Sequence, residues 1–182
     1  MHSGTLELYP SVGSQGLQVL ISTVTPNPLL AGSQILNAKS EQGQPVAQGA
    51  YLPAKRYGNM IFTSGMTPRK DGVLLYAGPV RSAIPLENYR DAVVLACSNA
   101  LAAARNTLTT HEQVAALLSM TVYIAAEDDF TAHSALADFA SQYLESELGS
   151  VGIGCRAAVG VATLPKDASV EIQLIAAVEE RK

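Results

Sequence analysis

The chain has little charge, few aromatic residues and only two cysteines among its 182 residues. Charged residues make up 15% of the chain, aromatic residues make up 5%, and tryptophan is absent. The two cysteines, Cys97 and Cys155, are too few for a disulfide scaffold and favour a reducing compartment. Both are expected to be small buried side chains rather than nucleophiles. So few charges in a chain that is 48% hydrophobic predict a compact protein that covers part of its surface by self-association.

Clusters of positive charge and long apolar runs are also missing. The formal net charge is −4, and no group of lysines and arginines could neutralise a nucleic acid backbone or an anionic membrane. No apolar run approaches the roughly 20 residues that a membrane-spanning helix needs. The N-terminus lacks the basic start and apolar core of a secretory signal. These absences predict a cytoplasmic protein whose partners include neither nucleic acid nor membrane.

Motifs for cofactors and metals are missing or stand in the wrong context. The letters GIGCRA at 152–157 match a dinucleotide fingerprint, but they follow a predicted helix and open a predicted strand, which is the reverse of what the fingerprint requires. The three histidines, His2, His111 and His133, lack metal-ligand spacing, and His133 is expected on a solvated helix surface. The acids at 127–129 are explained as favourable charges at a helix N-terminus. We expect no metal and no organic cofactor.

The composition changes at about residue 46. Residues 1–46 scatter Pro, Gly, Ser and Asn around one β-prone run and are predicted to be a partly irregular N-terminal extension. Residues 47–182 are predicted to form one domain. Its predicted elements are a strand at 56–65 paired through Asp71-Gly72 with a strand at 73–78, a helix at 85–108, a strand ending near 126, a helix at 127–149, and strands at 157–164 and 169–178. This β-β-α-β-α-β-β order predicts an α+β fold with both helices packed on one face of a single sheet.

Arg156 and Glu171 are the two charges whose positions suggest a site. Arg156 stands at the start of a predicted strand, where it could be either a solvated end charge or a ligand-binding group. Glu171 lies inside the apolar run SVEIQLIAAV, and strand alternation places it on the face it shares with Ser169 and Gln173. With helices covering the other face, this polar face is either solvated or the wall of a pocket.

Three segments resemble the RidA/YjgF family, the reactive-intermediate (enamine/imine) deaminases. They are YGNMIFTSGMTP at 57–68, MTVYIAAEDDF at 120–130 and CRAAVGVATLPKDASVEIQLIAAV at 155–178. The resemblance covers roughly residues 47–180. It implies a chorismate-mutase-like fold, a homotrimer whose sheets form a central barrel, and pockets between subunits that use no metal or organic cofactor.

The resemblance also implies roles for individual residues. Arg156 aligns with an arginine that binds the carboxylate of a 2-imino acid, and Glu171 aligns with a glutamate that orients or activates the attacking water. Tyr51 and Ser64 align with pocket residues, although Tyr51 could equally pack at an edge and Ser64 could be a small strand-end residue. The implied reaction is hydrolytic deamination of the imino acid to a keto acid and ammonia. A guanidinium fork suits a carboxylate, and one positioned carboxylate can activate water and move protons.

Three positions depart from the pattern of active members. Ser134 stands where an asparagine is common, and we keep it as a candidate substrate-binding residue. Ala157 replaces a common serine after the arginine, and Met66 replaces a common glutamine after Thr-Ser-Gly. These departures leave a second hypothesis open, a non-catalytic trimer that binds small carboxylates or partner proteins. RNA cleavage, a label that some family members carry, fits poorly with the acidic charge.

Overall fold

The protein is described by a computed structural model in which residues 47–181 are placed. The predicted extension, 1–46, lies outside these residues. The strands are β1 (Ala54–Tyr57), β2 (Met60–Thr63), β3 (Arg69–Lys70), β4 (Val73–Leu74), β5 (Glu112–Ala125), β6 (Cys155–Val161) and β7 (Val170–Glu180). The helices are α1 (Arg90–Arg105) and α2 (His133–Leu148), and 3-10 turns lie at Leu86–Tyr89, Gly149–Gly152 and Pro165–Asp167.

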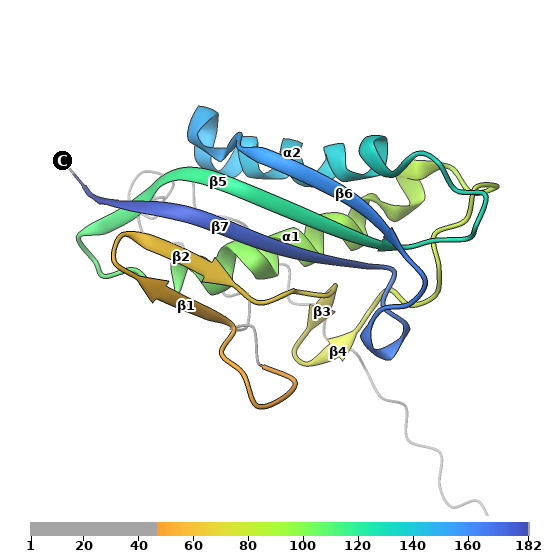
Figure 1. The fold of residues 1–182 in the computed structure, drawn as a ribbon, viewed down its shortest axis with the longest axis horizontal. Coiled ribbons are helices and arrows are strands. Elements are labelled where there is room, and N and C mark those ends of the chain that lie inside the picture. Colours follow the sequence, from red (N-terminus) through yellow and green to blue (C-terminus); the bar gives the residue numbers. More distant parts are fainter. Residues whose placement is uncertain (1–46, 182) are drawn as a thin grey trace, which may run out of the picture. The chain divides into compact units, whose positions relative to one another are not determined.

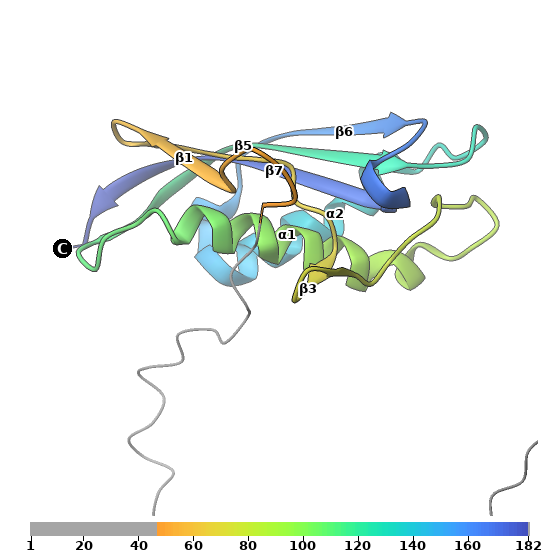
Figure 2. The same cartoon turned by 90° about the horizontal axis from the view of Figure 1, so that it is seen from below.

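One mixed sheet of five strands, in the order β1-β2-β7-β5-β6, forms the main layer (Figure 1). Both helices pack on one face of it, and no helix of residues 47–181 lies on the opposite face (Figure 2). The predicted α+β fold with two helices on one side of a single sheet is therefore confirmed. β5 lies between β7 and β6 in this sheet, and it pairs antiparallel with β7 and parallel with β6. Consequently β6 and β7, which follow one another in the chain, are not neighbours in the sheet.

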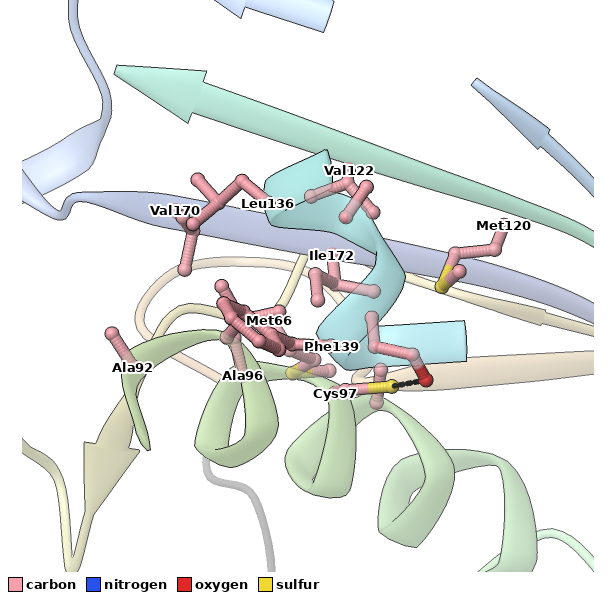
Figure 3. Close-up of a cluster of buried hydrophobic side chains, with 14 of the residues drawn as sticks. Met66, Ala92, Ala96, Cys97, Met120, Val122, Leu136, Phe139, Val170 and Ile172 are labelled. Carbon is pink, nitrogen blue, oxygen red and sulfur yellow. Dashed lines mark hydrogen bonds between the residues drawn. The ribbon is translucent and has the colours of Figure 1, made fainter. Parts of the chain in front are cut away.

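The core lies between the sheet and the helices (Figure 3). α1 presents a row of buried alanines at helical spacing, which lets the helix approach the sheet closely. α2 adds Leu136 and Phe139, and the sheet adds Val122 and Ile172. Each fully buried large apolar side chain stabilises the fold by about 1.5–3 kcal/mol relative to exposure. No helix among residues 47–181 has the length and apolar character to cross a membrane.

The predicted hairpin between 56–65 and 73–78 is wrong. The first segment is itself a hairpin, because Gly58 adopts a positive φ of 59° and turns β1 into β2. β2 then pairs with β7 rather than with 73–78. Asp71-Gly72 does form a turn, but it joins only the two-residue strands β3 and β4 in a separate sheet. Gly58-Asn59 is also a two-residue hairpin turn signal, and it lies inside the run taken for one strand.

The predicted role of the acids at 127–129 is also wrong, because α2 begins only at His133. The acids lie in the preceding loop and bind the loop at 81–82. The Ser82 hydroxyl donates to Asp129 Oδ2 at 2.6 Å, and Arg81 Nε lies 3.4 Å from Glu127 Oε1. These contacts join two loops rather than cap a helix.

Three smaller expectations, for His133, Cys155 and Ser169, also fail. His133 is partly buried, because its Nε2 lies against Gly160 and its ring packs edge-on against the Phe130 ring. The two ring centroids are 4.9 Å apart. Cys155 is exposed at the start of β6, whereas Cys97 is buried as expected. Ser169 is buried beside Tyr76 instead of sharing an open face with Glu171.

Candidate functional site

Glu171 lies on the helix-free face of the sheet. Its strand neighbours Val170 and Ile172 are fully buried on the helix side, so alternation turns Glu171 to the other side, beside Tyr123 of β5. The side chain is partly buried, and among residues 47–181 no group donates a hydrogen bond to its carboxylate. Loss of hydration therefore raises the pKa of the Glu171 carboxyl above its usual value. The neutral form of this carboxyl is therefore favoured more than in a solvent-exposed glutamate.

Gly65 supplies the surface on which the Glu171 carboxylate lies. A methyl group built on Gly65 would overlap that carboxylate, so only glycine permits this approach. The next residue, Met66, bridges to Ile172 of β7 and buries its side chain in the core. At a position where the resembled family commonly has glutamine, this chain therefore has a methionine, Met66, that belongs to the core. Asn99 of α1 holds the following segment by donating to the Thr67 and Arg69 carbonyl oxygens at 3.1 and 2.8 Å.

Substituting Gly65 with alanine is expected to lower the rate of any reaction that uses Glu171 by about tenfold or more, because the added methyl displaces the carboxylate. The fold should survive, since the group that must move is the free end of a flexible side chain. Turnover and thermal unfolding would be measured together. In a Glu171→Gln background the same substitution should change turnover no further, and an independent additive loss would contradict the contact.

Ser64 and Tyr51 lie near the same end of β2. The Ser64 hydroxyl donates to the Leu52 carbonyl oxygen at 2.7 Å, and the Ser64 N–H donates to the Pro53 carbonyl oxygen at 2.8 Å. Ser64 thus ties the loop before β1 to the segment that carries Gly65. Tyr51 is exposed in that loop, and its hydroxyl accepts a hydrogen bond from the Gln48 N–H at 3.2 Å. Both remain candidate pocket residues, and the Ser64 hydroxyl already has a structural partner.

Arg156 lies on the opposite side of the sheet, against α2. It occupies the edge strand β6, and its register partner on β5 is Met120, which is buried on the helix side. Its Nη1 donates to Asp138 Oδ1 at 2.7 Å and to Ser141 Oγ at 2.9 Å. Its Nη2 donates to Ser134 Oγ at 3.0 Å and to the Ser134 carbonyl oxygen at 3.3 Å. The structure therefore brings the candidate residues Arg156 and Ser134 together.

Asp138 and Ser141 are the contacts that the sequence analysis missed. Together with Ser134 they stand at i, i+4 and i+7 of α2, which puts all three on one stripe of the helix. That spacing was visible in the sequence. The sequence did not predict that β6 lies next to this stripe of α2.

Arg156 and Glu171 do not meet within one chain. Arg156 shares a face with Met120, and Glu171 shares the opposite face with Tyr123, because residues paired across neighbouring strands point the same way. The candidate residues form two half-sites. The Glu171 half-site comprises Glu171, Gly65 and Ser64, and the Arg156 half-site comprises Arg156 and the α2 stripe.

The described part of the chain also has a pocket that lies apart from both half-sites. A surface pocket of about 430 Å³ is lined by residues 82–86 and 129–132 and includes neither half-site. Within residues 47–181 no cluster of three or more His, Cys, Asp or Glu side chains could hold a metal ion.

Comparison with known proteins gives a consistent family. A family model described as endoribonuclease L-PSP matches residues 41–178. The protein Atu1372 of unknown function from Agrobacterium tumefaciens is 28% identical over 74% of this chain and 85% of its own, with a TM-score of 0.66. E. coli TdcF, solved with bound serine, is 27% identical over 75% of this chain and 94% of its own, with a TM-score of 0.54. The E. coli YjgF gene product is 26% identical over 75% of this chain and 94% of its own, with a TM-score of 0.52. A search of curated protein sequences gave no match.

Proposed function

The chain belongs to the RidA/YjgF family, which the matching model describes as endoribonuclease L-PSP, and from this membership we propose that it hydrolyses reactive enamine or imine intermediates of small carboxylic acids to the keto acid and ammonia. The observation that carries the proposal is Glu171, a partly buried carboxyl of raised pKa that lies against Gly65 without a hydrogen-bond donor among the described residues. A carboxyl in such a setting suits general acid-base catalysis. The working domain is proposed to be residues 47–182, with 1–46 as an extension.

Arg156 is proposed to hold the substrate carboxylate. A guanidinium binds a carboxylate through two parallel N–H groups and keeps its charge in a partly buried site. Arg156 lies on an edge strand, where a ligand can reach it. The relative TdcF was solved with serine, a small molecule that carries a carboxylate. A ligand of that class is proposed for Arg156.

The complete pocket is proposed to form between subunits of a homotrimer. Because the two half-sites face opposite sides of one sheet, a single chain cannot present both to one small ligand. The helix-free face also leaves apolar side chains uncovered, among them Phe62 and Val159. A trimer whose sheets turn these faces inward would bury them and bring the Arg156 half-site of one chain to the Glu171 half-site of the next.

The proposed reaction needs only water and these side chains. Glu171, as the carboxylate, takes a proton from water while the water oxygen bonds to the carbon of the protonated imine and the C=N electron pair moves to the nitrogen. Glu171 then returns its proton to the amine nitrogen of the tetrahedral intermediate. The C–N bond then breaks and ammonia leaves with the bonding electron pair, while the hydroxyl group gives its proton to Glu171 and the C=O bond of the keto acid forms. Glu171 releases that proton to the solvent. Arg156 holds the carboxylate throughout, which fixes the reacting carbon next to the water.

The test is ammonia release from a 2-imino acid that an amino-acid oxidase generates in situ. The wild-type protein is expected to accelerate the release at least about tenfold over the free solution, because it delivers an oriented water. An imine of the same size without the carboxylate serves as the control and should not be accelerated, since it offers nothing to Arg156. Equal acceleration of both imines would contradict the carboxylate role, and acceleration of neither would remove the hydrolysis proposal.

A second candidate function is carboxylate binding without turnover. It is favoured by Ser134 and Ala157, which depart from the active pattern, and by the full engagement of both Arg156 terminal nitrogens. It predicts binding of pyruvate without accelerated ammonia release. We propose a cytoplasmic location for either function, since Cys97 and Cys155 are both free thiols.

A further inference from the structure

The Arg156 guanidinium is already occupied by α2. Its two terminal nitrogens carry four N–H groups, and four acceptors take them: Asp138 Oδ1, Ser141 Oγ, Ser134 Oγ and the Ser134 carbonyl oxygen. Only the Nε–H lacks an acceptor among the described residues. A ligand carboxylate that binds in the bidentate manner needs two parallel N–H groups. It must therefore take over at least one N–H that now serves α2.

Asp138 is the strongest competitor among these acceptors. Its Oδ1 is the closest of the four to the guanidinium, at 2.7 Å, and it alone carries a negative charge. It is also the same chemical group that the proposed ligand would present. A second carboxylate at Arg156 would have to lie close to Asp138 and be repelled by it.

The exposure of the two side chains shows which one can move. The Asp138 side chain is 53% exposed, whereas the Arg156 side chain is 21% exposed. Asp138 can turn into solvent with little loss of burial, and an ion pair this exposed contributes little to stability. Arg156 would stay in place through Ser134 and Ser141, which are uncharged. The pair can therefore open without disturbing the fold.

We propose that Asp138 acts as an internal carboxylate latch, which occupies Arg156 in the empty protein and must be displaced when a carboxylate ligand binds. This inference rests on the proposed carboxylate site and extends it. Asp138 thereby sets the affinity for anionic ligands. Because the latch opens during binding, it acts on the binding step and leaves the later chemical step unchanged.

The opposite role for Asp138 is that of a positioning residue, which would hold Arg156 in the geometry that a ligand needs. The two roles predict opposite signs. Removal of a latch tightens carboxylate binding, whereas removal of a positioning residue weakens it.

The experiment compares wild type with Asp138→Asn, using pyruvate as the probe in isothermal titration and the 2-imino acid in turnover. Asp138→Asn is expected to bind pyruvate about fivefold more tightly, the size expected when a half-exposed ion pair no longer competes. KM should fall by the same factor with kcat unchanged. Asp138→Ala, which removes the acceptor as well as the charge, should give at least as large a change.

Glu147→Gln is the matched control. Glu147 lies on the same helix and pairs with Arg105 at 2.8 Å, so the variant removes one helix carboxylate and one arginine ion pair away from Arg156. It should leave pyruvate affinity and KM unchanged. An equal gain in the control would assign the effect to the general charge of α2 and overturn the latch.

The outcomes separate the latch from the proposed hydrolysis. Tighter binding in Asp138→Asn supports the latch even if no variant releases ammonia, a result that would remove only the hydrolysis. Wild-type ammonia release with no gain in Asp138→Asn overturns only the latch. Weaker binding, a lower kcat, or no pyruvate binding by either Asp138 variant also overturns it.

Discussion

Replacing Glu171 with glutamine is expected to lower kcat for imine hydrolysis by about 10²- to 10⁴-fold, the usual contribution of a general acid-base group. Glutamine has nearly the shape of glutamate, so it should still lie against Gly65 and leave the pocket intact. What it loses is the ability to take a proton from water. KM should therefore change little, and single-turnover ammonia release would measure the loss directly.

The pH dependence of wild type provides a second check on Glu171. If the carboxylate form is the base, the rate falls as the pH drops through the pKa of Glu171. Burial raises that pKa, so the acidic limb should lie at a higher pH than for an ordinary glutamate. Glu171→Gln should lack this limb. A limb that survives in the variant would assign it to another group.

The stability of Glu171→Gln should change in the opposite sense to its activity. A carboxyl with a raised folded-state pKa favours its neutral form in the folded protein, so its contribution to stability falls as the pH rises through the raised pKa. At neutral pH the glutamine variant avoids this cost and should unfold at a slightly higher temperature than wild type. A lower Tm would show that the charged group has a stabilising partner.

Glu179→Gln is the control for Glu171→Gln. Glu179 lies on the same strand and the same face, eight positions away in the sequence, and it accepts a hydrogen bond from Gln113 Nε2 at 3.0 Å. Its substitution should leave kcat unchanged. A comparable loss in both variants would mean that the face, rather than Glu171, had been altered, and wild-type kcat in Glu171→Gln would end the base assignment.

Much of the fold could be predicted from local pattern, because the relevant signals are short-range. The alanine row of α1 and the alternation in β7 report directly which side of each element is buried. The errors arose where two turn signals competed or where a contact came from far along the chain. Gly58-Asn59 competed with Asp71-Gly72 as the turn, and the acids at 127–129 bind residues 81–82 rather than the helix that follows them.

The candidate site could be predicted only in part, for a similar reason. Arg156 and Glu171 stood out by their positions in predicted strands, whereas their roles and the choice of Ser134 came from resemblance. The contact between Arg156 and Ser134 then follows from β6 lying over α2. The relation between Arg156 and Glu171 depends on β5, which lies between their strands and sets a separate register with each. A register shift of one residue would turn either side chain to the other face. No motif in 155–178 carries that information.

Mixing two inactive variants is expected to restore activity, because the two half-sites face opposite sides of the sheet in each chain. Arg156→Ala lacks the side chain proposed to bind the substrate carboxylate, and Glu171→Gln lacks the proposed base. Each variant should therefore be nearly inactive alone. In a mixed cyclic trimer, one interface combines the intact Arg156 of one chain with the intact Glu171 of its neighbour, which leaves about one site in three complete. The variants would be co-refolded, separated by a tag on one of them, and assayed for ammonia release.

A second mixture, in which no chain has an intact Arg156, is the control for this recovery of activity. Arg156→Ala refolded with a chain that carries both substitutions contains no intact Arg156, so it should stay inactive at every ratio. If one chain supplied both residues to its own site, each chain in the first mixture would carry a defect and no activity would return. Verified mixed oligomers without activity would therefore refute the shared pocket, while recovery in the first mixture alone would show that Arg156 and Glu171 act on one substrate from two chains.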